Sequence, residues 1–158
     1  MNTIDRLTAL LACLAATPCL ATVLDVTDAL KSDAVASVLA YGARHVRGEA
    51  DGPDYIEGGW EEAFWLAPIV LRARIELDRR WASFTDPVEW GAVGNALLDV
   101  DAVLSPHADA LRLVPGATWD AFEAEGETFD DGSWWGDVRV ATLREWVSWG
   151  DRCANVVE

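Results

Sequence analysis

Histidine, serine and cysteine supply most enzymatic nucleophiles and bases, and this chain of 158 residues holds few of them in usable combinations. His45 and His107 are its two histidines, and neither has a cysteine or a second histidine at metal-site or dyad spacing. We expect both to be surface or helix-capping residues. No serine stands in a G-x-S-x-G elbow. The sequence therefore predicts no catalytic residue, and we expect the protein not to be an enzyme.

Cofactor and metal signatures are also missing from the sequence. Cys13, Cys19 and Cys153 match no zinc spacing, and the first two lie in an apolar run where buried thiols are expected. There is no phosphate-binding glycine loop and no dinucleotide fingerprint. The acidic loops lack the alternating ligands of a calcium-binding EF-hand. We expect no cofactor and no metal site.

Paired carboxylates are the remaining chemistry, because an acid and a base can be two carboxyl groups with separated pKa values. Asp99 and Asp101 are two residues apart and cannot share a helix face. Any such pair would come from the acidic loops. A secreted carbohydrate-active enzyme, with tryptophan as the sugar platform, is therefore kept as one alternative.

The acidity is concentrated in two segments without a lysine or arginine. Residues 48–62 carry six carboxylates and residues 120–137 carry seven, against a net charge of −15 for the whole chain. Such local fields attract a cationic partner and repel nucleic acid. The alternative is a pair of solvated loops.

Nine tryptophans accompany this acidity. Trp81 and Trp146 fall on apolar helical stripes and are assigned to packing. Trp60, Trp134 and Trp135 border or lie within the acidic segments, where they either pack down the loops or form a recognition surface. The candidate binding residues are Glu49, Asp51, Asp54, Glu57, Trp60, Glu61, Glu62, Asp120, Glu123, Glu125, Glu127, Asp130, Asp131, Trp134, Trp135 and Asp137.

A pair of antiparallel helices in the middle of the chain must position these residues. Asp86, Pro87 and Glu89 read as the cap, first residue and third residue of one helix, which ends near Ser105-Pro106. Pro68 is expected to open the preceding helix, after a short acidic turn over residues 60–67. The apolar stripes are Val93, Ala96, Leu97, Val100 and Leu104 in one helix and Val70, Ala73, Leu77 and Trp81 in the other.

The other elements are also predicted to be helical. One helix is expected over residues 27–46, a short one over 106–112, and another containing Trp119 and Phe122 that Thr118 caps and Gly126 stops. Residues 127–137 are expected to form a loop or irregular hairpin. A last helix is expected over 137–154, with a strand over 138–143 as the alternative.

The first 21 residues have two interpretations. An apolar run followed by Thr17-Pro18-Cys19-Leu20-Ala21 resembles a secretory signal peptide, which would place the protein outside the cytoplasm. The same residues also predict a helix that is capped near Thr3 and ends before Pro18, because Ile4, Leu7, Leu11 and Leu14 fall at helical steps. We favour the retained helix and a cytoplasmic location.

Together these patterns predict a mainly α, single-domain helical bundle of about five to six helices over residues 1–158. A Trp-rich acidic loop, or a short hairpin, is expected near its C-terminus. In charge and size the chain resembles nuclease inhibitors, immunity proteins and DNA-mimicking proteins, which implies a non-catalytic module for a basic protein surface.

A structural subunit of a virion is the other alternative. The central helical pair, with Arg72, Arg74, Arg79 and Arg80, loosely resembles small helical head-to-tail adaptors of tailed phages. That resemblance implies a ring in which this basic stretch meets an acidic neighbour. We expect no direct contact with nucleic acid or membrane, and a homo-oligomer stays open.

Overall fold

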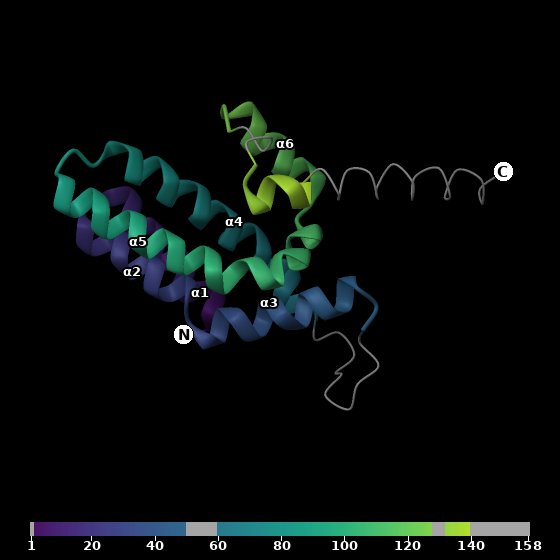
Figure 1. The fold of residues 1–158 in the computed structure, drawn as a ribbon. Helices are drawn as coiled ribbons and strands as arrows, with labels where there is room; N and C mark the ends of the chain where they lie inside the picture. Colours follow the sequence, from purple (N-terminus) through teal and green to yellow (C-terminus); the bar gives the residue numbers. More distant parts are fainter. Residues whose placement is uncertain (1, 50–59, 128–131, 140–158) are drawn as a thin grey trace.

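Helix α4 (Trp60–Ser83) is the longest element of the computed structural model, which describes residues 2–49, 60–127 and 132–139. It is preceded by α1 (Thr3–Ala16), α2 (Leu20–Leu30) and α3 (Asp33–Val46). It is followed by α5 (Pro87–Leu104), the 3-10 helix η1 (Ser105–Leu113), α6 (Gly116–Ala124) and a helical stretch over 134–139. The described residues contain no strand, so the mainly α class is confirmed and a hairpin is not part of the described fold (Figure 1).

Two hydrophobic cores share α4. One core joins α1, α2, α3 and α5 to the α4 residues Leu66, Val70 and Leu77. The other joins η1, α6 and residues 134–139 to Leu71 and Ile75 on a neighbouring face of α4. Figure 1 shows this division: α1, α2, α4 and α5 run side by side, and α6 lies beyond the end of α5. Helix α4 therefore connects the bundle to the C-terminal elements.

Side-chain caps mark the starts of α1, α3 and α5. Asn2 accepts a hydrogen bond from the Asp5 amide at 2.8 Å, and Asp86 accepts from the amides of Val88 and Glu89 at 2.8 and 3.2 Å. Each cap satisfies amide groups that have no partner in the first turn. The predicted starts of α1 and α5 are confirmed to within a residue, and all five residues of the predicted α5 stripe are buried.

The single helix predicted over 27–46 is wrong, because Ser32 interrupts it. The hydroxyl of Ser32 accepts from the Val35 amide at 3.4 Å and caps α3. Helix α2 begins earlier than expected, at Leu20, where the Thr22 hydroxyl accepts from the Cys19 amide at 3.0 Å. Serine and threonine satisfy helix starts in this way, so both signals were present in the sequence.

Pro68 does not open a helix but lies inside α4. An internal proline costs a backbone hydrogen bond, typically about 3 kcal/mol. Ala63 and Leu66, before it, are as fully buried as Val70 after it. The apolar stripe therefore continues through Pro68, and burial of residues on both sides outweighs the lost hydrogen bond.

Three further predictions are corrected. Helix α6 starts at Gly116 rather than at a Thr118 cap, although Gly126, with a φ of 93°, lies just beyond its end as expected. Cys13 and Cys19 are exposed rather than buried. Helix already covers residues 134–139, so Asp137 is neither a loop residue nor the start of a helix, and the strand alternative fails at residues 138 and 139. Residues 140–154 of the expected last helix, including Trp146, lie outside the described residues.

Candidate functional site

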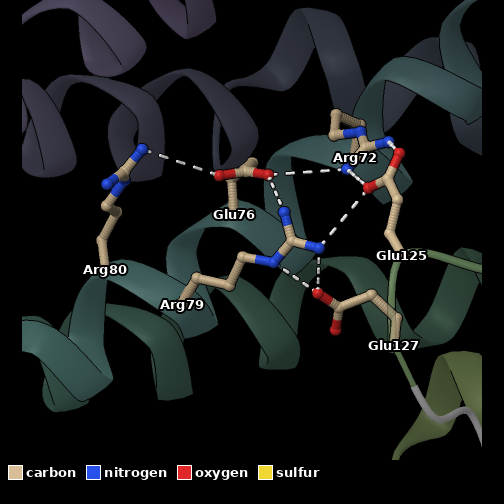
Figure 2. Close-up of polar contacts among 6 residues, drawn as sticks. All are labelled: Arg72, Glu76, Arg79, Arg80, Glu125 and Glu127. Atoms are coloured by element: carbon tan, nitrogen blue, oxygen red, sulfur yellow. Dashed lines mark hydrogen bonds and ion pairs between the residues drawn. The ribbon is translucent and has the colours of Figure 1, made fainter.

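The carboxylates after α6 contact arginines of α4. Glu125 accepts two parallel hydrogen bonds from Arg72, at 2.9 Å from Nη1 and 3.0 Å from Nη2. Glu127 accepts from Arg79, which also donates to Glu76 at 2.6 Å. These residues, with Arg80 3.9 Å from Glu76, form the arginine network shown in Figure 2.

The arginine network shifts two pKa values. The hydrogen bond from Arg72 is the largest cause that holds the pKa of Glu125 below its ordinary value. Burial lowers the pKa of Arg79, but the hydrogen bond to Glu127 and the charge of Glu76 outweigh it and hold that pKa above its ordinary value. Both shifts favour the charged forms, so the network is an ion-paired junction between α4 and the chain after α6.

A second arginine pairs with the carboxylates of α6 itself. Arg139 has a side chain only 5% exposed, and its Nη2 and Nε lie 3.2 Å from Asp120 and 3.3 Å from Glu123. Its guanidinium carbon lies 5.6 Å from the ring centre of Trp119, which is fully buried. Asp120 and Glu123 therefore help to join α6 to residues 134–139.

The two adjacent tryptophans also contact the bundle. Trp135 is 7% exposed, and the guanidinium carbon of Arg74 lies 4.6 Å from its ring centre. Trp134 donates from Nε1 to Oδ1 of Asp101 at 3.1 Å. Both tryptophans lie against the α4–α5 pair, so in the described structure they pack rather than form an exposed platform.

The first acidic segment is described only at its ends. Glu49 lies 3.3 Å from Arg47, and Trp60 stacks on His45 with ring centres 4.7 Å apart. Glu61 and Glu62 are exposed in the first turn of α4, with no ion pair inside the described ranges. The candidates that lie outside the described residues are Asp51, Asp54, Glu57, Asp130 and Asp131.

The described parts of the two acidic segments do not lie together. In Figure 1, α6 lies above the segment that follows α5, and the C-terminal end of α3 lies below that segment. The four carboxylates on and after α6 have arginine partners in the same chain, whereas Glu61 and Glu62 have none within residues 2–49, 60–127 and 132–139. The structure thus separates the candidates into ion-paired and unpaired groups.

Sequence reasoning missed the intramolecular partners of these acids. The sequence pattern suggests a neighbouring subunit as the partner of Arg72 and Arg79, and it indicates no partner for Arg139. Their pairing depends on where α6 packs, which no local pattern specifies. The sequence does contain a signal for another surface, on α5. Trp90 and Leu98 are apolar residues that lie outside the predicted stripe, and the structure leaves them 48% and 68% exposed.

The part of the chain that the structure describes offers no group of side chains suited to a metal ion. That part holds no cluster of three or more histidine, cysteine, aspartate or glutamate side chains able to bind a metal ion. Its three main pockets each have at most one carboxylate among their lining residues. None of its helices combines the length and apolar character needed to cross a membrane.

Comparisons of the chain with protein-family models, with curated proteins and with solved structures found no match.

Proposed function

We propose that the protein is a non-catalytic binding module for a positively charged protein, acting as an inhibitor, an immunity protein or a nucleic-acid mimic. The observation that carries this proposal is how the charged side chains pair. Eight of the ten described lysines and arginines lie within 4.0 Å of a carboxylate: Lys31, Arg47, Arg72, Arg74, Arg79, Arg80, Arg112 and Arg139.

The excess negative charge is then left on carboxylates without a basic neighbour. Within the described ranges, nine have no ion pair: Asp5, Asp25, Asp33, Glu61, Glu62, Asp86, Glu89, Asp99 and Asp137. Only Arg6 and Arg44 remain as bases without an ion pair there. A surface of this kind attracts cationic proteins and speeds their association, and salt screens the attraction.

The pairing does not favour the alternative of a virion subunit. That alternative uses the basic stretch from Arg72 to Arg80 to meet an acidic neighbour, but each of its four arginines already contacts a carboxylate of the same chain. A secreted carbohydrate-active enzyme needs two facing carboxylates, and no observation on the described residues favours it.

The test is recovery of the partner, followed by reconstitution. The tagged chain would be cross-linked in the cells that make it, with an unrelated acidic protein of similar isoelectric point as the control bait. We expect a basic protein that the control does not retain, and that binds the purified chain one to one with an affinity that falls as salt rises. An acidic partner, salt-independent binding, or recovery of no stoichiometric protein would overturn the proposal.

A further inference from the structure

An apolar groove of about 410 Å³ lies between α4 and α5. Its lining residues include Trp81, Trp90, Gly91, Gly94, Leu98 and Asp101. Trp81 stacks on Trp90 with ring centres 4.8 Å apart and donates from Nε1 to the Trp90 carbonyl at 3.0 Å. Trp90 and Leu98 nevertheless stay 48% and 68% exposed, which makes this α4–α5 groove an apolar surface without a partner in the described chain.

The groove is elongated along one face of α5. Its lining residues on that helix recur at steps of three and four from Trp90 to Asp101. At 1.5 Å per residue this face is about 16 Å long, or about three helical turns. A partner helix with apolar side chains at positions i, i+3, i+4 and i+7 has the shape to lie along it.

Gly91 keeps the groove open at a cost to α5. A glycine inside a helix is less stable than alanine there, because its backbone loses more conformational freedom on folding. Packing within the chain explains the glycine at position 94, because an added Cβ at Gly94 would lie 3.3 Å from the Trp81 ring. An added Cβ at Gly91 would have nothing within 4 Å, so the described chain supplies no contact that requires glycine. A backbone surface free of side chains is what close approach of a second helix needs.

The charge around the groove specifies a cationic occupant. Residues 81–104, which cover the end of α4 and all of α5, contain four carboxylates, at Asp86, Glu89, Asp99 and Asp101, and no lysine or arginine. Arg74 lines one end of the groove, but it is ion-paired with both Asp78 and Asp101, so that end remains net negative. A second copy of this chain, with its net charge of −15, would be repelled.

We propose that the α4–α5 groove binds a basic amphipathic helix of the partner protein. Its apolar side chains pack on Trp90 and Leu98, and its lysines or arginines lie near the carboxylates of Asp78, Asp99 and Asp101. This inference rests on the proposed function and specifies the surface and the type of partner element. It places recognition on α5 rather than on the two acidic segments.

The test uses a fluorescent synthetic helix of leucine and lysine, with leucine at helical spacing, and measures its Kd by anisotropy. The control peptides are a scrambled sequence of the same composition and a version with glutamate in place of lysine. We expect the amphipathic peptide alone to bind one to one. Equal binding of the scrambled peptide would overturn the inference, because it would show attraction to charge without a groove.

Two matched protein variants locate the site. Leu98→Glu and Trp65→Glu each add one negative charge at an exposed apolar residue, but only Leu98 lines the groove. We expect Leu98→Glu to weaken peptide binding about tenfold and Trp65→Glu to leave it within about twofold. Attraction by net charge alone predicts tighter binding for both variants. Unchanged or tighter binding of Leu98→Glu would overturn the groove assignment.

The same variants separate this inference from the proposed function. If the basic native partner binds wild type and Leu98→Glu equally, the groove is wrong and the binding module stands. If wild type has no basic partner, the proposed function fails, whatever the peptide does. Gly91→Leu gives a second check, because its side chain enters open space: we expect a folded protein with peptide binding reduced about tenfold.

Discussion

Arg74 on α4 and Asp101 on α5 form a two-bond ion pair, with Nε 2.7 Å from Oδ1 and Nη2 2.9 Å from Oδ2. The Arg74 side chain is 6% exposed and also contacts Asp78. Burial lowers the pKa of Arg74, but hydrogen bonds to Asp101 and Asp78 hold that pKa above its ordinary value. The same carboxylate of Asp101 accepts from Trp134, so one ion pair connects α4, α5 and residues 134–139.

We predict that Asp101→Asn lowers the free energy of unfolding by about 2 kcal/mol. Removing one partner of a fully buried pair costs about 3–5 kcal/mol, and the cost is smaller here because Asp78 remains. Urea unfolding would measure it. Asp99→Asn is the matched control, because Asp99 is exposed and has no ion pair in the described ranges. Equal stability of the two variants would contradict the role of the pair.

We predict that Gly42→Ala destabilises the fold by about 1–3 kcal/mol, the usual cost of overpacking. An added Cβ there would lie 2.5 Å from the Cβ of Ala63, where α3 and α4 approach closely. Gly91→Ala is the control, because its Cβ meets open space, and it should raise stability by up to about 1 kcal/mol. Thermal unfolding would compare them, and a tolerated Gly42→Ala would show that the two helices are not in close contact.

The arginine network should make stability depend on pH through Glu125. Its pKa is held below the ordinary value of 4.5, chiefly by the Arg72 hydrogen bond. A carboxylate whose folded-state pKa is depressed contributes stability above the unfolded pKa, and that stability is lost as pH falls through the folded-state pKa.

We therefore predict that Glu125→Gln is less stable than wild type at neutral pH and low salt. The difference should shrink as the pH falls below 4.5, where the wild-type carboxylate also becomes neutral, and it should shrink as salt rises. Denaturant unfolding at several pH values would measure it. A difference that stays constant across this range would mean that packing, and not the ion pair, gives Glu125 its effect.

The N-terminal helix is predicted to be part of the core. Leu14 is 2% exposed, so Leu14→Ala should lower the free energy of unfolding by about 2–5 kcal/mol. Cys13→Ala changes the neighbouring residue, which is exposed, and should have little effect. Calorimetry of both variants in the full chain would test this. Similar stability of Leu14→Ala and wild type would show that α1 does not pack on the bundle.

Local sequence patterns predicted the features of the fold that neighbouring residues alone determine. The Asp86-Pro87 start and the Val93-to-Leu104 stripe of α5 need only a cap and a 3.6-residue period, and both were confirmed. Ser32 is an equally local signal, but the apolar residues on both sides of it masked the break. No local sequence pattern predicts that Pro68 lies inside α4. The helix continues through Pro68 because other helices bury the residues on both sides of it.

The candidate site was less predictable for the same reason. The charge of Glu125 is visible in the sequence, but its pairing with Arg72 spans 53 residues and exists only once α6 has joined the core that contains Leu71 and Ile75 of α4. A cluster of acids in a sequence therefore indicates attraction for a cation, without showing whether that cation belongs to the same chain. The exposure of Leu98 likewise depends on which face of α5 its neighbours cover.

Competition between the leucine–lysine peptide and the reconstituted native partner would show whether the partner binds in the α4–α5 groove. The partner, bound to the wild-type chain, would be titrated with the peptide at moderate salt, and the complex followed by light scattering. We predict that the amphipathic peptide displaces the partner one to one and that the scrambled peptide does not. A partner that stays bound at saturating amphipathic peptide would contradict it.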